Sequence, residues 1–394
     1  MDKQTIRDVD VAGKTVIVRV DFNVPQDKEG NVTDTTRIQA ALPTIRYLLD
    51  RNAAVILMSH LGRPDGKVVE KLKMAPVARE LERLVGRPVK VAPDCVGPEV
   101  ERMARDLKPG EILMLENLRF HPEEEANDAG FAKQLASLAD LYVNDAFGTA
   151  HRAHASTAGI AAYLPAVAGF LMEKELSALG GILENPKRPL AAVIGGAKVS
   201  TKIKVLDSLL AKSDTLIIGG GMANTFLKAK GIDVGKSLLE EDKLEVARDL
   251  MKKAEQRGVT LGLPVDAVVA ERFDADEPSK VVDVESVPPG WVIMDIGPRT
   301  IAAFGEMLRP ARTIFWNGPM GVFERPKFAE GTRAIAEILA NSGAVTVVGG
   351  GESVAAVEQM GYADRMTHVS TGGGASLELI EGRTLPGVAA LKDK

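Results

Sequence analysis

Short apolar runs rich in β-branched residues alternate along this chain with longer segments of helical period. This alternation constrains the fold more than any other feature, because strands that alternate with helices form βαβ units and build parallel sheets. The runs at 55–58, 191–194 and 215–218 are apolar nearly throughout, which indicates strands buried on both faces. We therefore expect an α/β protein built from doubly wound parallel sheets.

The helical segments carry readable start and stop signals. The segment 75–86 has Pro76 near its start and Gly86 at its end, an arrangement that predicts a helix between them. The segments 241–258 and 332–343 repeat the pattern, each with apolar residues on one face and a final glycine.

A length of 394 residues favours two or three domains. Residues 170–184 have helical spacing with Gly180–Gly181 at the centre, and two prolines follow in 185–189. This pattern predicts a connecting helix with a soft centre, although an ordinary crossover helix with a weak point fits it too. The expected division is an N-terminal domain at 1–170, a connecting hinge helix at 171–187, a C-terminal domain at 188–380, and a tail at 381–394 that packs back on the N-terminal domain.

Composition excludes several classes of function. A net charge of −5 argues against nucleic-acid binding, which normally needs a basic excess. No apolar run approaches the length of a membrane span, and the N-terminus lacks the apolar segment of a signal peptide. Cys95 is the only cysteine, so no intrachain disulfide can form and a cytoplasmic location is expected.

The strands of the two halves end in different residues. In the first half they end in charged, amide or imidazole side chains: Asp21, Asn23, His60, Arg63, Arg119, Asp145, His151 and Arg152. Ligands of open α/β sheets lie outside the carboxyl ends of the strands, and a row of arginines there binds a small anion. Each arginine alone would be an ordinary surface residue, so the argument depends on their succession.

In the second half, the equivalent runs end in glycine, at 195–196, 219–221, 349–351 and 372–374. Glycines at this edge let backbone N–H groups approach phosphates at helix N-termini, although tight turns also use them. Neither a P-loop nor a GxGxxG fingerprint is present. The i,i+4 spacing of Lys198 and Lys202 predicts two cations on one face of a helix that begins after Gly195–Gly196, either around an anion or as a solvated basic face.

Ten segments in family order resemble the phosphoglycerate kinase family: VDFNVP, SHLGRP, ENLRFH, DAFGTAHRAHAS, GGAKVSTK, IIGGGM, DIGP, WNGPMGVFE, VVGGGES and VSTGGGASLELIEG. The resemblance implies two Rossmann-like domains and a reversible phosphoryl transfer between ATP and the carboxylate of 3-phosphoglycerate, which gives ADP and 1,3-bisphosphoglycerate. It implies that the phosphoglycerate is bound by Asp21, Asn23, Arg37, His60, Arg63, Arg119 and Arg152. It implies that the nucleotide is bound by Gly196, Lys198, Lys202, Gly221, Asn317, Glu324, Gly350, Gly351, Glu352 and Ser353.

The expected chemistry is positioning and charge neutralisation, because a carboxylate nucleophile is already ionised and needs no general base. Arg37, Lys202 and the backbone N–H groups around Gly373 are the expected catalytic groups. The resemblance also implies Mg²⁺, with Glu352 at the family's metal position, where aspartate is usual, and a monomer that binds neither nucleic acid nor membrane.

Two other classes fit parts of the pattern. A dehydrogenase with a mononucleotide-type fold would explain the glycines, but its fingerprint is missing. A two-lobed binding protein for small anions would explain the arginines, but it is usually exported and no signal peptide is visible.

Overall fold

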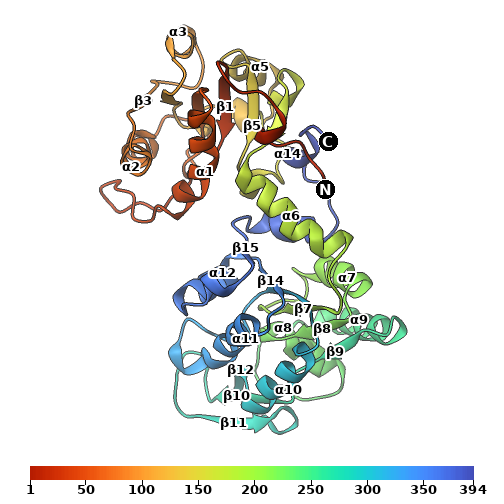
Figure 1. Ribbon diagram of the computed structural model, residues 1–394. Coiled ribbons are helices and arrows are strands. Elements are labelled where there is room, and N and C mark those ends of the chain that lie inside the picture. Colours follow the sequence, from red (N-terminus) through yellow and green to blue (C-terminus); the bar gives the residue numbers. More distant parts are fainter. The chain divides into compact units, whose positions relative to one another are not determined.

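The computed structural model describes residues 1–394, and the chain divides into two compact units (Figure 1). Unit 1 comprises Met1–Ser177 and Thr384–Lys394, and unit 2 comprises Ala178–Arg383. The boundary falls inside helix α6 (Phe170–Glu184), which runs without interruption through Gly180 and Gly181. None of the helices combines the length and the apolar character that crossing a membrane requires.

Unit 1 contains one six-stranded sheet in which every pairing is parallel. Its order is β3 (Val89–Val91), β4 (Ile112–Met114), β2 (Ala54–Met58), β1 (Thr15–Arg19), β5 (Leu141–Asn144) and β6 (Ala166–Ala168). Strands β1, β2, β4 and β5 are buried almost throughout, as their apolar sequences predict.

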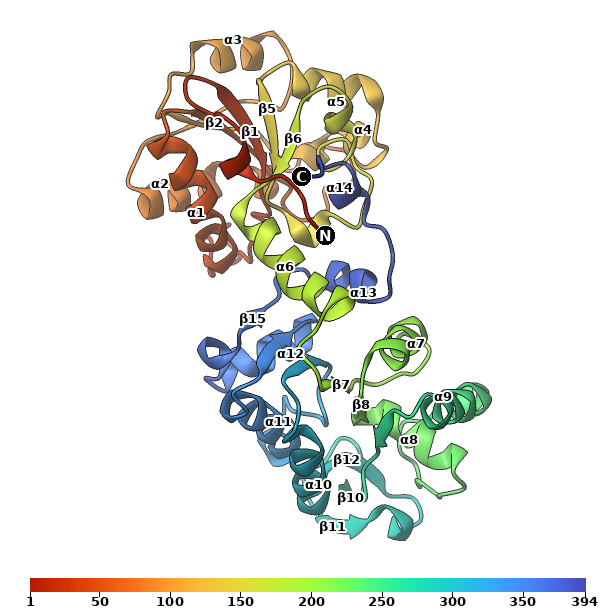
Figure 2. The same cartoon turned by 45° about the vertical axis from the view of Figure 1, so that its right-hand side comes forward.

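Helices cover both faces of this sheet: α1 and α2 lie on one side, and α4 and α5 on the other (Figure 2). The unit's helices are α1 (Thr36–Asp50), α2 (Ala75–Val85), α3 (Pro98–Asp106), α4 (Pro122–Glu125), α5 (Ala129–Ala136) and α14 (Pro386–Ala389). Val16 and Val18 of β1 pack against the buried face of α1, at Ile38 and Ile45, whereas Ile17 between them is buried on the opposite face.

The C-terminal tail belongs to unit 1. Its backbone N–H groups at Gly387 and Lys392 donate to the carbonyls of Ala150 and Ala166, and the carbonyl of Lys392 accepts from Gln4. The last residues of the chain are therefore tied to the turn after β5, to β6 and to the N-terminal segment.

Unit 2 contains a second six-stranded parallel sheet. Its order is β15 (His368–Val369), β14 (Val345–Val348), β13 (Thr313–Asn317), β7 (Leu190–Ile194), β8 (Thr215–Ile218) and β9 (Thr260–Gly262). The expected pair of doubly wound parallel sheets is thus confirmed.

The helices of unit 2 also cover both faces of its sheet, with α10, α11 and α12 on one side and α7, α8 and α9 on the other (Figures 1 and 2). They are α7 (Ile203–Lys212), α8 (Gly220–Ala229), α9 (Leu244–Gln256), α10 (Pro298–Leu308), α11 (Glu330–Asn341), α12 (Gly351–Gln359) and α13 (Gly374–Ile380). Trp316 of β13, fully buried, packs with Phe304 of α10 and Ile335 of α11 at the centre of the core.

A small antiparallel sheet adds to unit 2 and was not expected from the sequence. It comprises β11 (Ser279–Asp283), β10 (Asp266–Ala270) and β12 (Val292–Ile296), in that order. Ala267 and Val269 of β10 pack against Leu227 of α8, so this sheet extends the core beyond α8.

Candidate active site

Each six-stranded sheet has one place where the chain reverses the direction in which it adds strands. In unit 1, β1 pairs with β2 on one side and with β5 on the other; in unit 2, β7 pairs with β8 and β13. Open α/β sheets bind ligands outside the carboxyl ends of the strands at such switch points. The predicted site residues can therefore be sought beyond β1 and β5, and beyond β7 and β13.

Arg37, at the start of α1, is held against the loop that follows β1. Its Nη1 donates to the backbone carbonyl of Asn23 at 2.8 Å and pairs with Asp21 Oδ1 at 3.2 Å. Asn23 Oδ1 in turn accepts from the backbone N–H of Gly62 at 2.9 Å, which joins this loop to the loop after β2. Asp21, Asn23 and Arg37 are thus brought together, with the guanidinium still 44% exposed.

A fully buried arginine, Arg19, lies beneath this edge at the end of β1. Its Nε donates to Ser156 Oγ at 2.9 Å, and that hydroxyl donates to Glu124 Oε2 at 2.5 Å, so a buried carboxylate compensates the buried cation. Its Nη2 contacts His60 Nδ1 at 3.0 Å. Arg19 was not among the predicted site residues, although a charged residue at the end of an apolar strand is a signal that the sequence contains.

The contact with Arg19 fixes the chemistry of His60. A guanidinium can only donate, so Nδ1 of His60 accepts and the ring proton lies on Nε2. Burial, followed by the charges of Arg19, Arg119 and Arg37, holds the pKa of His60 well below its usual range. His60 therefore presents a neutral N–H donor at this edge.

The charges of neighbouring arginines also act on Arg119 and on a second histidine, His154. Burial and the charge of Arg19 lower the pKa of Arg119, whose Nε lies 3.3 Å from Glu125 Oε1. Burial, with Arg119, Arg19 and Arg152 around it, lowers the pKa of His154 to about 4. Cations that depress one another's pKa values form a site that an anion would stabilise. Arg63 and Arg152 are exposed, and Arg152 Nε donates to the imidazole of His151 at 3.4 Å.

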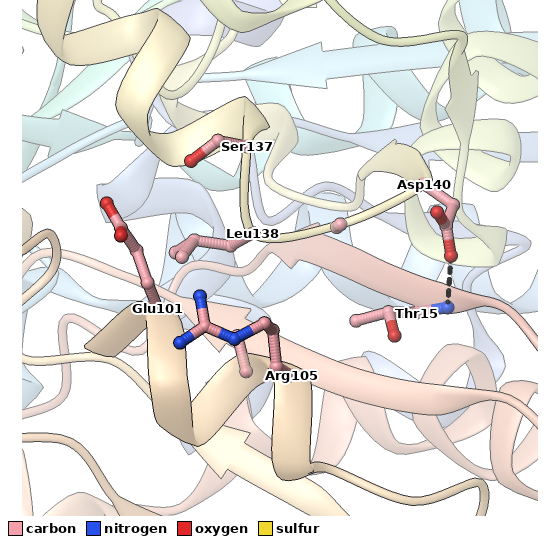
Figure 3. Close-up of a pocket in the computed structure, with 8 residues that line it drawn as sticks. Thr15, Glu101, Arg105, Ser137, Leu138 and Asp140 are labelled. Atoms are coloured by element: carbon pink, nitrogen blue, oxygen red, sulfur yellow. Dashed lines mark hydrogen bonds between the residues drawn. The ribbon is translucent and has the colours of Figure 1, made fainter. Parts of the chain in front are cut away.

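The opposite edge of the same sheet has a different character. A hollow there is lined by Thr15, Glu101, Arg105, Ser137, Leu138 and Asp140, among others, and Asp140 accepts from the backbone N–H of Thr15 (Figure 3). Arg105 shares this lining with the two carboxylates of Glu101 and Asp140. This hollow therefore has no excess of positive charge, unlike the carboxyl edge.

In unit 2, Lys202 lies at the switch point. Its Nζ donates to the carbonyl of Gly195, after β7, at 2.7 Å and to Asn317 Oδ1, at the end of β13, at 2.6 Å. Burial lowers the pKa of Lys202 to about 8, and the nearby carboxylate of Glu352 opposes that shift. A phosphate at this position would restore full protonation of the amine.

The glycine loops approach one another too closely for side chains. A Cβ at Gly350, whose φ is +95°, would lie 2.2 Å from Asn317 Nδ2, which itself donates to the carbonyl of Gly349. Ser353 is buried and its Oγ accepts from the backbone N–H of Gly318 at 2.6 Å. Asn317, Gly350 and Ser353 therefore shape the loops around Lys202.

A cavity of about 210 Å³ opens beside these loops. Four of the predicted residues line it: Gly196, Gly221, Glu324 and Glu352. Its other lining was missed and is largely apolar, including Leu238 and Phe273, each 51% exposed. An apolar wall beside glycine loops suits a nucleobase, and scattered apolar residues in loops carry no sequence signal that distinguishes them from surface positions.

Two expectations need correction. The chain after Gly195–Gly196 does not enter a helix; α7 begins at Ile203 with Lys202 as its N-cap, so Lys198 and Lys202 do not share a helical face, and Lys198 is exposed. Asp145, expected among the polar strand ends, is fully buried and accepts from the backbone N–H groups of Leu171 and Met172 in the first turn of α6.

Known proteins share this architecture and sequence. The phosphoglycerate kinase family pattern matches residues 6–383. The chain is 63% identical to the phosphoglycerate kinase of Moorella thermoacetica over 394 residues and 61% identical to that of Roseiflexus sp. over 395 residues, in each case across all of both chains. The structure of phosphoglycerate kinase from Coxiella burnetii aligns with a TM-score of 0.91 at 43% identity, and that from Pyrococcus horikoshii with 0.81 at 36%, each covering 98% of both chains.

These matches set aside both the dehydrogenase and the anion-binding protein, because the relatives are kinases and align with this chain across its full length. The two switch-point sites lie in the sequence segments that carry the likeness. The chain belongs to the phosphoglycerate kinase family.

Proposed function

We propose that the arginine cluster of unit 1, which comprises Arg37, Arg63, Arg119 and Arg152, binds 3-phosphoglycerate. The glycine loops of unit 2 bind the nucleotide, and Arg37 and Lys202 act on the group that is transferred between the two substrates. As a phosphoglycerate kinase, the chain is an enzyme of glycolysis that transfers a phosphoryl group between ATP and 3-phosphoglycerate. The observation that carries the assignment of sites is the placement of Arg37 and Lys202 at the two topological switch points.

The acid substrate suits the edge of unit 1. Exposed guanidinium groups at Arg63 and Arg152 bind a phosphate or carboxylate bidentately, and the Nε2–H of His60 adds a neutral donor. Asp21 and Asn23 are proposed to contact the phosphoglycerate as well, while Oδ1 of Asp21 holds Arg37 and Oδ1 of Asn23 holds the loop after β2.

The transfer itself needs charge neutralisation rather than proton abstraction. The attacking carboxylate is ionised at neutral pH, so no general base is required. Lys202, held by Gly195 and Asn317, and Arg37, held by Asn23, are positioned cations that lose little freedom when the charge on the transferring group develops. The backbone N–H groups around Gly373, before α13, add donors to the same group.

The residues present also fit Mg²⁺. Glu352 lies in the first turn of α12, is exposed, and lines the nucleotide cavity near Lys202, so it offers the hard oxygen ligand that Mg²⁺ prefers. When bound with the nucleotide, Mg²⁺ would neutralise phosphate charge. We further propose a cytoplasmic monomer with a domain division near α6, and no nucleic-acid or membrane partner.

Kinetics of single variants test the division of labour. In an assay that couples ATP formation from ADP and 1,3-bisphosphoglycerate to a coloured product, Arg37→Ala is expected to lower kcat by about 10²-fold or more, because Arg37 would act on the transition state. Arg63→Ala is expected chiefly to raise KM for the phosphoglycerate, about tenfold, because it would bind ground and transition states alike.

The matched control is Arg105→Ala, which removes an arginine from the opposite edge of the same sheet and is expected to leave both constants unchanged. A large fall of kcat in Arg63→Ala with an unaltered kcat in Arg37→Ala would reverse the two roles.

A further inference from the structure

Asp94, Cys95 and His121 form a cluster in unit 1 that the phosphoryl transfer does not use. Asp94 and Cys95 lie between β3 and α3, and His121 precedes α4, so two separate segments meet here. The carboxylate, thiol and imidazole atoms all lie within 4.8 Å of one another.

In the cluster, a hydrogen bond joins His121 to Asp94 at the position that a metal cation would occupy. His121 Nε2 lies 2.5 Å from Asp94 Oδ1, and the thiol of Cys95 donates to the carbonyl of Glu116 at 2.9 Å. Cys95 is fully buried, whereas the side chains of His121 and Asp94 are 26% and 47% exposed, so the cluster has a closed side and a side open to solvent.

The surroundings of the cluster are acidic. Burial, followed by the charges of Asp94, Glu124 and Glu116, raises the pKa of the Cys95 thiol well above its usual range, so the thiol keeps its proton until a cation displaces it. Glu123 Oε2 lies 4.0 Å from His121 Nδ1, the nitrogen that faces away from Asp94. A carboxylate that accepts a hydrogen bond from the second ring nitrogen is the usual outer partner of a metal-binding histidine, and Glu123 would have to approach Nδ1 by about 1 Å to make that bond. The ring also packs on Phe131, with 5.1 Å between ring centroids.

We propose that Asp94, Cys95 and His121 bind one zinc ion through a thiolate, an imidazole nitrogen and a carboxylate oxygen, with water from the open side as the fourth ligand. Sulfur and nitrogen donors select Zn²⁺ over Mg²⁺ and Ca²⁺, which prefer oxygen alone. The thiolate and the carboxylate balance the two charges of the ion, and the neutral imidazole completes the set.

The required rearrangement is small. Zinc–ligand bonds of about 2.0–2.3 Å place tetrahedral donor atoms about 3.3–3.6 Å apart. The contact between Asp94 and His121 therefore has to widen by roughly 0.8 Å, and the sulfur, which lies within 4.8 Å of the other donor atoms, has to move inward by up to about 1.2 Å. The thiol proton leaves to solvent, and the hydrogen bond from the thiol to the backbone carbonyl of Glu116 is lost. The bound ion would link the β3–α3 loop to the start of α4, the helix that carries Glu124 of the Arg19 network.

The test uses the full chain, reduced and stripped of metal with a chelator that is then removed. Competition of Zn²⁺ with a coloured chelator is expected to show one ion per chain, and saturation is expected to raise the Tm by roughly 5–10 °C at a hundredfold excess over Kd. Co²⁺ in place of Zn²⁺ is expected to give thiolate-to-metal charge-transfer absorption, which reports on Cys95 because the chain has no other cysteine.

Variants separate this site from adventitious binding. Cys95→Ser and His121→Gln are each expected to weaken zinc binding at least about 100-fold, and Glu123→Gln about tenfold, as removal of an outer partner does. Asp106→Asn, an exposed carboxylate on α3 outside the cluster, is the matched control and keeps the affinity of the wild type.

Two results would overturn the proposal: Co²⁺ bound without charge-transfer absorption, or Zn²⁺ bound with unchanged affinity by His121→Gln. Both are readable even if Cys95→Ser fails to fold, since the first needs only the wild type and the second replaces a partly exposed side chain. None of these outcomes depends on phosphoryl-transfer activity.

Discussion

Two kinds of cation form the positive edge of unit 1. Arg37, Arg63 and Arg152 are exposed, whereas Arg19 is fully buried and bonded to Ser156 and His60. The exposed arginines could be predicted because Arg37 lies at the start of α1, and because Arg63 and Arg152 lie in the segments that follow β2 and β5. Arg19 could not be given its role, because Ser156 is 137 residues away in the chain and only the folded sheet brings them together.

The acid stability of unit 1 depends on His154. Its pKa falls from 6.5 to about 4 in the fold, so the unfolded chain binds more protons between these values and stability is lost as the pH falls from about 6.5 towards 4. Between about pH 8 and about pH 5, we expect the wild type to lose about 2 kcal/mol of unfolding free energy that His154→Gln does not lose.

Urea unfolding in a phosphate-free buffer measures this difference. Phosphate is expected to diminish it, because a bound anion would raise the pKa of His154 in the folded state. Identical pH dependence in the two proteins would mean that His154 is not held neutral by its burial and by the arginines around it.

The proposed metal role of Glu352 can be tested at the same scale. We expect Glu352→Ala to raise the Mg²⁺ concentration needed for half-maximal activity and to lower kcat, because the variant removes an oxygen ligand. Glu352→Asp is expected to keep activity, since it keeps the carboxylate. An alanine variant with unaltered Mg²⁺ dependence and turnover would leave Glu352 as a carboxylate that only stabilises the helix N-terminus.

At the scale of elements, helix ends were easier to predict than helix starts. Gly86 adopts a φ of +74° and its N–H donates to Glu82, as expected of a glycine that ends a helix, and Gly258 and Gly343 also have positive φ. The start of α7 was placed too early, because the i,i+4 spacing of Lys198 and Lys202 is equally compatible with a loop. Local spacing does not reveal that the segment must first pass Gly195 and hold Lys202 against Asn317.

Asp145 acts as a cap for α6, and this role makes a prediction about stability. Asp145→Ala removes the acceptor for two N–H groups of the first turn and is expected to lower the unfolding free energy by about 1–2 kcal/mol. Asp145→Asn keeps a carbonyl oxygen in that place and is expected to retain most of the stability.

The two proteins differ further with pH. Burial raises the pKa of Asp145 from 3.8 to about 6, so its favourable contribution is complete below the unfolded value and is lost as the pH rises through about 6. Between about pH 4 and about pH 8, the unfolding free energy of Asp145→Asn should therefore rise relative to that of the wild type. Equal losses in the alanine and asparagine variants at every pH would contradict the capping role.

At the scale of the whole molecule, the sequence predicted doubly wound sheets because apolar runs alternate with helical segments. It predicted two different halves because the runs of the first half end in charged, amide or imidazole residues and those of the second half end in glycine. The antiparallel sheet of β10, β11 and β12 escaped prediction, since its outer strand is half exposed and Val281 alone is 53% exposed, which weakens the apolar signal of a strand. The arginine cluster and the glycine loops belong to different units, and we propose that transfer involves a domain movement that brings the bound substrates in line and excludes water.

We expect that movement to bend α6 at Gly180–Gly181, and Gly181→Ala tests it. A Cβ at Gly181 would meet no atom within 4 Å, so alanine causes no clash. Alanine is expected to stabilise the helical conformation at this position by about 1 kcal/mol, which makes bending there less favourable. Solution scattering of the wild type is expected to give a smaller radius of gyration with 3-phosphoglycerate and ADP together than with either alone. Gly181→Ala should contract less and turn over more slowly, while its affinity for each substrate alone stays unchanged.

Gly305→Ala is the matched control, because it places alanine inside α10 at an ordinary 3.6 Å contact with Ile338. A radius that does not change in the ternary complex, or equal turnover in the two variants, would place the movement elsewhere than in α6.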